Sequence, residues 1–100
     1  MFDPAAIVGF DRDVGNERKS ADKHGVSQGE AEHVFFNQPL LLLEDDRHSL
    51  AEPRFHALGA TNEGRRLHIT FTLRGGDTLI RVISARDMHR NERAVYAQSP

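Results

Sequence analysis

A stretch of strict alternation constrains the fold of this chain more than any other feature. Residues 67–73 read LHITFTL, with an apolar side chain at every second position. Side chains of a β-strand point alternately to the two faces of a sheet, so this pattern predicts a strand with one buried and one polar face. Gly75 and Gly76 follow it, and tight hairpin turns need the positive φ that glycine tolerates. We therefore predict a hairpin that returns into a second strand over 78–84.

Arginines follow this second strand at helical spacing. Arg86, Arg90 and Arg93 recur at i, i+4 and i+7, which would place them on one face of a helix. Ser84 can act as the N-cap of this helix, with Asp87 three positions further on. A row of guanidinium groups at this spacing suits successive phosphates or carboxylates, although a solvated helix flank would show the same pattern. The sequence thus predicts that the strand runs directly into an arginine-rich helix.

The rest of the chain supplies further strands and helices. Ser27 and Glu30 have the spacing of a capping box, so a helix begins there, and it must end before Pro39. Other elements are predicted by apolar runs and turn residues: strands over 7–10, 40–43 and 54–60, a surface helix over 16–24, and an acidic loop over 44–49. The order strand, helix, helix, four strands, helix indicates an α+β domain with a mainly antiparallel sheet.

Length and composition restrict the class of protein. The 100 residues are enough for one domain with one core, and we expect residues 1–100 to form it, with flexible ends at 1–6 and 98–100. The chain has no cysteine, which excludes disulfides and thiolate metal sites. The longest apolar run, 40–43, is too short to cross a bilayer, and no signal peptide precedes it, so we expect a cytoplasmic protein that does not contact membranes.

Period-two alternation also assigns charged residues to one face of the sheet. Arg54, His56, His68 and Arg81 each lie between residues that we expect to be buried, so all four should point away from the core. A solvated polar face accounts for His68 and for the neighbouring threonines. Two arginines among short polar residues instead predict a cationic concavity. The net charge of −2 argues against non-specific nucleic-acid binding but leaves room for such a local basic site.

Motifs of other enzyme classes are absent from the sequence. No HExxH, Walker loop or GxGxxG occurs, and the histidines at positions 24, 33, 48, 56, 68 and 89 lack the spacing of metal ligands. We therefore expect neither a metal nor a cofactor. Lys23 and His24 lie in the last turn of the predicted surface helix, where cations favour the helix dipole whatever other role they have.

Several separate motifs resemble the BrnT family, the toxins of type II toxin–antitoxin modules. They are KHGVS at 23–27, EA at 30–31, DDRHS at 45–49, E-x-R-F-x-A-L-G at 52–59 and R-x-ISAR at 81–86, followed by Arg90, Glu92 and Tyr96. The resemblance runs from about residue 10 to residue 96. The chain departs from the family pattern in having Phe10 for a tryptophan, Asn16 for a lysine and Ser20 for an asparagine.

The resemblance implies a RelE-like fold and a ribonuclease activity that halts translation. It also implies inhibition by a cognate BrnA antitoxin, a ribbon-helix-helix protein, so that the toxin would meet DNA only through its partner. The alternative is an attenuated or non-enzymatic module of the same fold whose basic face docks an acidic partner segment. Direct DNA binding is disfavoured by the acidic net charge and by the lack of a helix-turn-helix frame.

Metal-independent RNA cleavage requires deprotonation of the 2′-hydroxyl, stabilisation of the phosphorane and protonation of the leaving 5′-oxygen. We expect Arg81 and Arg86 to clamp the phosphate, with Arg54 as a third guanidinium in the same pocket. These arginines would then stabilise the phosphorane.

Proton transfer could come from Lys23, His24 or His89, and the sequence does not choose among the three. We expect Glu92 to orient an arginine rather than to act as a base. The RNA would be held by the basic and imidazole side chains of the sheet face and the last helix, namely Arg54, His56, His68, Arg90 and Arg93.

Overall fold

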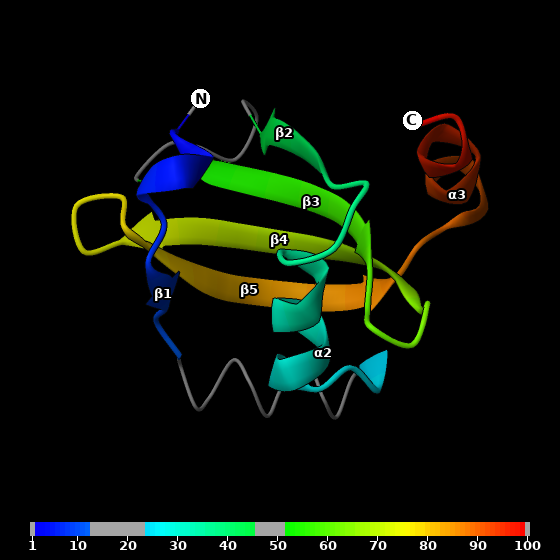
Figure 1. The fold of residues 1–100 in the computed structure, drawn as a ribbon, viewed down its shortest axis with the longest axis horizontal. Helices are drawn as coiled ribbons and strands as arrows, with labels where there is room; N and C mark the ends of the chain where they lie inside the picture. The colour runs from blue at the N-terminus through cyan, green and yellow to red at the C-terminus, as the bar shows by residue number, and fades with distance from the viewer. Residues whose placement is uncertain (1, 13–23, 46–51, 100) are drawn as a thin grey trace.

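A computed structural model describes residues 2–12, 24–45 and 52–99 of the chain. In chain order these residues form η1 (Pro4–Ala6), β1 (Gly9–Phe10), α2 (Gln28–Val34), β2 (Leu41–Asp45), β3 (Arg54–Ala60), β4 (Arg66–Arg74), β5 (Leu79–Asp87) and α3 (Arg90–Ala97) (Figure 1). The α+β class is therefore confirmed. The predicted surface helix over 16–24 lies outside the described residues except for His24. None of the helices in the described ranges is long and apolar enough to cross a membrane.

Five strands form one sheet in the order β1-β5-β4-β3-β2. The pairs β2–β3, β3–β4 and β4–β5 are antiparallel, whereas β1 runs parallel to β5. The prediction of a mainly antiparallel sheet is thus confirmed. β2 is longer than predicted, because Glu44 and Asp45 pair with Phe55 and Arg54 of β3 instead of opening the acidic loop. The rest of that predicted loop lies outside the described residues.

The hairpin between β4 and β5 forms as predicted. Gly75 and Gly76 have φ values of 62° and 65°, in the left-handed region that glycine adopts without strain. After the turn β5 pairs with β4 as far as Asp87, which lies opposite Leu67. The strand therefore ends three residues later than the sequence indicated.

The predicted helix start at Ser84 is wrong. Ser84 lies within β5, opposite Thr70, and α3 begins only at Arg90, where the Glu92 carboxylate accepts a hydrogen bond from the backbone N–H of His89 at 2.8 Å. Continued pairing with β4 and complete burial of Ala85 outweigh the local capping signal at Ser84. Arg86 consequently belongs to the sheet, and the predicted row of three arginines on one helix face does not form.

The capping box at the start of α2 is present. Ser27 Oγ accepts a hydrogen bond from the backbone N–H of Glu30, and the Glu30 carboxylate accepts one from the backbone N–H of Ser27, both at 3.1 Å. The helix then packs closely on β3. A Cβ added to Gly59 would lie 2.5 Å from Val34 Cγ1, so only glycine permits this approach.

The main core lies between α2 and one face of the sheet (Figure 1). Its buried members include Ala31 and Val34 of α2 and the sheet residues Phe55, Ala57, Leu67, Ile69, Phe71, Val82 and Ala85. Phe2 lies in the stretch 1–6 that we predicted to be a flexible end, and its ring packs against Phe55 and Phe71 at centroid distances of 4.9 and 5.8 Å.

A second, smaller core holds α3 near the end of the sheet where β5 stops (Figure 1). It consists of Leu58, Met88 and Tyr96, with Leu41 packed against it. The Tyr96 hydroxyl donates a hydrogen bond to the carbonyl oxygen of Pro39 at 2.7 Å. Leu58 alternates with the core residue Ala57, so α3 packs on the sheet face opposite to α2.

Candidate active site

The sheet face opposite to α2 carries the polar residues that alternation assigned to it. Cross-strand pairs share a face of the sheet, and the register joins His68 to Arg86, Thr70 to His56 and Ser84, and Thr72 to Arg81. The predicted grouping of charged and imidazole side chains on one face is therefore confirmed by the register, and it comprises Arg54, His56, His68 and Arg81. Arg86, which we had placed on a helix, joins them.

One part of this face contains a connected cluster of side chains, here called the histidine cluster: Asp45, His56, His68, Arg86 and Glu92. His68 Nε2 lies 2.9 Å from His56 Nδ1, and His56 Nε2 lies 2.8 Å from Asp45 Oδ2. On the other side of the cluster, Glu92 Oε2 lies 2.7 Å from His68 Nδ1, and Arg86 Nη2 also contacts that nitrogen. Four strands and α3 supply these residues, so the cluster exists only in the folded chain.

Glu92 and Arg86 form a bidentate ion pair within the cluster. Arg86 Nη1 donates to Glu92 Oε1 at 2.7 Å and Nη2 donates to Oε2 at 2.9 Å. The hydrogen bonds from Arg86, together with the one from the His89 backbone, lower the pKa of Glu92 to about 2 although burial opposes this change. The structure thus pairs Glu92 with an arginine, as the sequence predicted.

When both imidazoles are neutral, the hydrogen bonds from Asp45 to His68 run in one direction, and only the contact of His68 Nδ1 with Glu92 lacks a hydrogen. A carboxylate can only accept, so His56 Nε2 carries a hydrogen that it donates to Asp45, and His56 Nδ1 is then an acceptor. His68 Nε2 donates to His56 Nδ1, which leaves His68 Nδ1 as an acceptor for Arg86. Glu92 Oε2, 2.7 Å from the same nitrogen, then faces it without a hydrogen between them, and Arg86 Nη2 bridges the two acceptors. Burial, and then the positive charge of Arg86, lower the pKa of His68, so the neutral imidazole is favoured.

Two of the three predicted phosphate clamps, Arg81 and Arg86, share a face but do not meet in one pocket. Arg81 lies opposite Thr72 and Arg86 opposite His68, a separation of four residues on β4 or about 13 Å. Arg81 forms an ion pair with Asp11, with Nε 3.7 Å from Oδ2. Arg86 is therefore the predicted clamp that contacts an imidazole, that of His68, and Arg81 lies at the other end of the face, where β1 joins the sheet.

The remaining predicted site residues lie at the end of the sheet near α3 or outside the described ranges. Lys23 belongs to the latter group. His24 lies close enough to Asp87 to contribute, after Arg65 and Arg93, to the lowered pKa of that carboxyl group. His89 is exposed immediately before α3.

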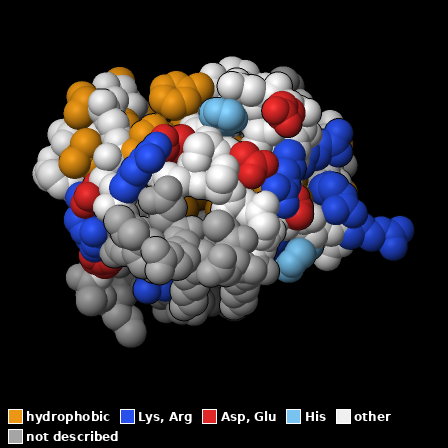
Figure 2. Space-filling model, turned by 90° about the horizontal axis from the view of Figure 1, so that it is seen from below, with side chains coloured by type: hydrophobic (Ala, Val, Ile, Leu, Met, Phe, Trp, Pro, Cys, Tyr) orange, Lys and Arg blue, Asp and Glu red, His pale blue; other side chains and the backbone are white. Residues whose placement is uncertain are grey.

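Exposed arginines surround the start of α3. Figure 2 shows basic side chains gathered at the end of the molecule that carries α3. Arg90 and Arg93 of α3 and Arg66 at the start of β4 are exposed there, and Arg93 Nη1 also donates to the carbonyl oxygen of Met88 at 2.9 Å. This basic end, defined by Arg66, Arg90 and Arg93, adjoins the histidine cluster through Glu92 of α3.

Sequence reasoning missed Arg65, which joins three segments near the predicted site. Its guanidinium donates to both carboxylate oxygens of Asp87, at 2.7 and 3.0 Å, to the carbonyl oxygen of Gly25 at 2.9 Å and to Glu30 at 3.1 Å. These contacts fix the corner that follows His24 against the end of β5. The partners are 22 to 40 residues away in sequence, so no pattern of neighbouring residues predicts these contacts.

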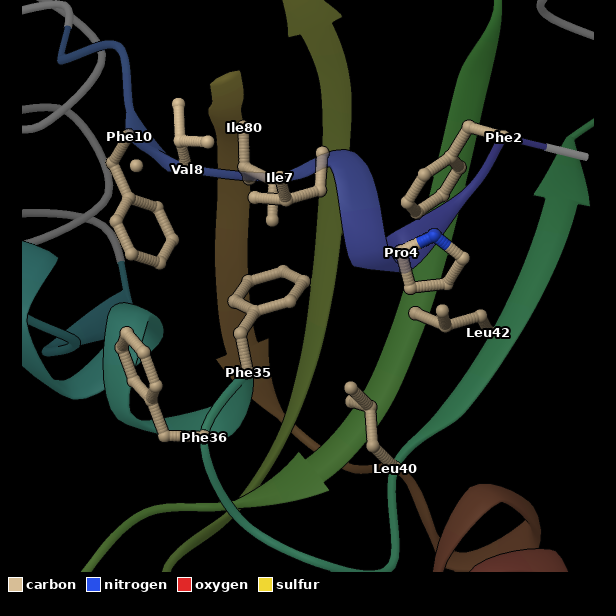
Figure 3. A pocket seen from close by; sticks show the side chains of 11 residues that line it. Phe2, Pro4, Ile7, Val8, Phe10, Phe35, Phe36, Leu40, Leu42 and Ile80 are labelled. Carbon is tan, nitrogen blue, oxygen red and sulfur yellow. The ribbon is translucent and has the colours of Figure 1, made fainter. Parts of the chain in front are cut away.

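Two pockets differ in chemistry. A pocket of about 260 Å³ adjoins the histidine cluster and is lined by Leu43, His56, Leu58, His68, Asn91, Glu92 and Val95. A second pocket, of about 310 Å³, opens between η1, β1 and the end of α2 (Figure 3). None of the described residues that line the second pocket is titratable, whereas His56, His68 and Glu92 line the first. Within the described ranges, no three His, Asp or Glu side chains are arranged to hold a metal ion.

Comparisons with known proteins agree on one family. The family model for BrnT, the ribonuclease toxin of a type II toxin–antitoxin system, matches residues 2–92. Among solved structures, the fold is similar to the 1.1 Å crystal structure of the ribonuclease toxin BrnT of Brucella abortus, with a TM-score of 0.63. The two sequences are 18% identical, over 83% of this chain and 99% of that chain, so this likeness supports the fold alone. A search of curated proteins found no match.

Proposed function

The chain belongs to the BrnT family of ribonuclease toxins of type II toxin–antitoxin systems, and on this premise we propose that it cleaves RNA without a metal ion. Its cleavage would inhibit translation in the cytoplasm. The observation that carries the proposal is the histidine cluster, because it joins two imidazoles to the guanidinium of Arg86 beside an open pocket. Imidazoles exchange protons near neutral pH, and a guanidinium stabilises phosphorane oxygens.

The cluster supports a specific first step. A phosphate that binds Arg86 would take the guanidinium away from both His68 Nδ1 and Glu92, and once the Glu92 carboxylate has also moved from this nitrogen, Nδ1 would accept the proton of the 2′-hydroxyl. The 2′-oxygen attacks phosphorus, the bond to the 5′-oxygen breaks, and a 2′,3′-cyclic phosphate remains. The lowered pKa of His68 keeps the imidazole neutral and ready to act as this base.

Other predicted residues would protonate the leaving group and bind the rest of the RNA. His89, His24 and Lys23 are the candidates for protonating the leaving 5′-oxygen, as the sequence suggested. Arg81 and Arg54, further along the same sheet face, would contact neighbouring phosphates, as would Arg90 and Arg93 of the basic end, and His56 would hold His68 in its tautomer.

The finer assignments of fold and partner also belong to the proposal. We propose that the fold is RelE-like and that the protein antitoxin, which membership in a type II system implies, is a BrnA-like ribbon-helix-helix protein. This antitoxin would neutralise the toxin by covering the polar sheet face and the basic end, and it would provide any contact with DNA.

A matched pair of arginine variants tests the proposed activity. Arg86 and Arg12 each form a bidentate pair with a glutamate, but the Arg12 pair with Glu32 lies on α2, away from the histidine cluster. The assay is cleavage of end-labelled RNA by purified protein in EDTA, with detection of cyclic phosphate ends. We expect Arg86→Ala to lose about 100-fold or more in rate and Arg12→Ala to retain activity.

Two outcomes would contradict the proposal: cleavage by wild type and Arg86→Ala at equal rates, or no cleavage by the wild type. The second would favour the alternative, a non-enzymatic module that docks an acidic partner segment on its basic face. The bidentate pair of Arg86 with Glu92 favours this alternative, because the guanidinium already has a carboxylate partner and does not need a phosphate.

A further inference from the structure

The pocket beside the histidine cluster has walls that are apolar and uncovered. Leu43 of β2 and Val95 of α3 line it and are 54% and 57% exposed. Between them lie the imidazoles of His56 and His68, whose ring centroids are 4.9 Å apart at an interplanar angle of 75°. The pocket thus offers aliphatic and aromatic surface to a flat, apolar ligand.

Asn91 adds a polar group to this pocket. It is exposed in the first turn of α3, and its amide offers two hydrogen-bond donors and an acceptor. Proteins read single-stranded RNA by stacking bases on aromatic side chains and by hydrogen bonds from amides to the base edges. A surface with both features fits a nucleobase better than an aliphatic side chain, which would leave the amide unused.

The position of the pocket links it to the proposed chemistry. His56, His68 and Glu92 belong both to the pocket lining and to the histidine cluster. A base in the pocket and a phosphate bound to Arg86 can therefore belong to one nucleotide.

We propose that this pocket binds the nucleobase of the nucleotide whose phosphate is cleaved, with Leu43 and Val95 against the base and Asn91 reading its edge. The inference rests on the proposed ribonuclease function and names the part of the substrate that confers sequence preference. The pocket holds one base, so the preference resides in a single nucleotide.

Nucleotide binding tests this inference separately from catalysis. The probes are the four nucleoside 5′-monophosphates, with inorganic phosphate as the probe for charge alone, and the readout is NMR titration of the Leu43 and Val95 methyl groups. We expect at least one nucleotide, but not phosphate, to shift these methyl signals. Val95→Asp should weaken that binding about tenfold or more, since it removes apolar surface from the base and places a carboxylate beside it.

Two further variants sharpen the test. Val8→Asp is the matched control, because Val8 is 80% exposed and lines the other pocket, and it should bind nucleotides as the wild type does. Asn91→Ala should change the order of affinity among the four nucleotides. The same change should appear in the bases at which RNA is cut.

The outcomes separate the two proposals. Equal shifts with phosphate alone, or equal nucleotide affinity in Val95→Asp and wild type, would overturn the base pocket even if RNA is cleaved. Methyl shifts produced by an apolar antitoxin peptide but by no nucleotide would also overturn it and would assign the pocket to a protein partner. Base-selective binding without RNA cleavage would uphold the pocket and refute the ribonuclease activity.

Discussion

Replacing Glu92 by glutamine should destabilise the protein in a strongly pH-dependent way. The Glu92 carboxylate accepts hydrogen bonds from both terminal nitrogens of Arg86 and from the His89 backbone, and it lies 2.7 Å from His68 Nδ1. Glutamine has nearly the same shape but no charge, so the substitution removes the ionic part of these contacts. It also leaves the half-buried guanidinium of Arg86 without the carboxylate that pairs with it.

The size of the effect follows from the proton affinity of Glu92. Its pKa falls from an ordinary value of 4.5 to about 2 in the folded protein, which corresponds to about 3 kcal/mol. The side chain is 23% exposed, so solvent screening reduces this to about 2 kcal/mol. Because the folded pKa is the lower one, this stabilisation is fully present above pH 4.5 and is lost as the pH falls from 4.5 toward 2.

Urea denaturation of both proteins at pH 7, 5.5, 4 and 3 measures this contribution. We expect Glu92→Gln to lose about 2 kcal/mol at pH 7 and 5.5, equivalent to a fall in Tm of about 10 °C, and the difference to shrink at pH 4 and 3. Glu32→Gln is the control: its partner Arg12 is 53% exposed, so its loss should be about 0.5 kcal/mol. A loss at pH 7 no larger than that of the control, or a loss that does not change with pH, would refute the reasoning.

Three further predictions concern stability and are checked by the same denaturation assay. Gly59→Ala should cost about 1–3 kcal/mol, because the new Cβ would lie 2.5 Å from Val34 Cγ1, and a neutral result would show that α2 moves freely on β3. Ser27→Ala should cost about 1 kcal/mol through loss of the α2 cap, whereas Ser27→Asp should restore most of it. The wild type should lose stability as the pH falls below about 6.5, since His68 resists protonation when folded, and His68→Asn should flatten this slope; an unchanged slope would assign it to other groups.

Features with local causes were predictable from the sequence. The capping box at Ser27 and Glu30 and the glycine turn between β4 and β5 depend on a few neighbouring residues, and both formed as expected. Alternation placed His56 and His68 on one sheet face for the same reason. Their direct contact follows from a register in which His68 lies opposite Leu58 and His56 opposite Thr70, and period-two patterns do not encode that register.

Errors arose where long-range pairing competes with local signals. Ser84 and Asp87 have the spacing of a helix start, but residues 84–87 gain more from pairing with 67–70 and from the burial of Ala85. The helix therefore begins after His89, a residue type that seldom caps helices. The move of Arg86 from helix to strand is the change that brings it to His68.

The short parallel strand β1 has a consequence for handling the protein. Gly9 and Phe10 pair with the first residues of β5, and flanking hydrogen bonds join Val8 N–H to the Thr78 carbonyl and Asp11 N–H to the Ile80 carbonyl at 2.8 Å each. This pairing shields part of an otherwise open sheet edge from other chains. Deletion of residues 2–11 would remove this pairing and expose the backbone N–H and C=O groups along the edge of β5. Strands of other molecules could then add to this edge, so the truncated chain should self-associate rather than remain monodisperse.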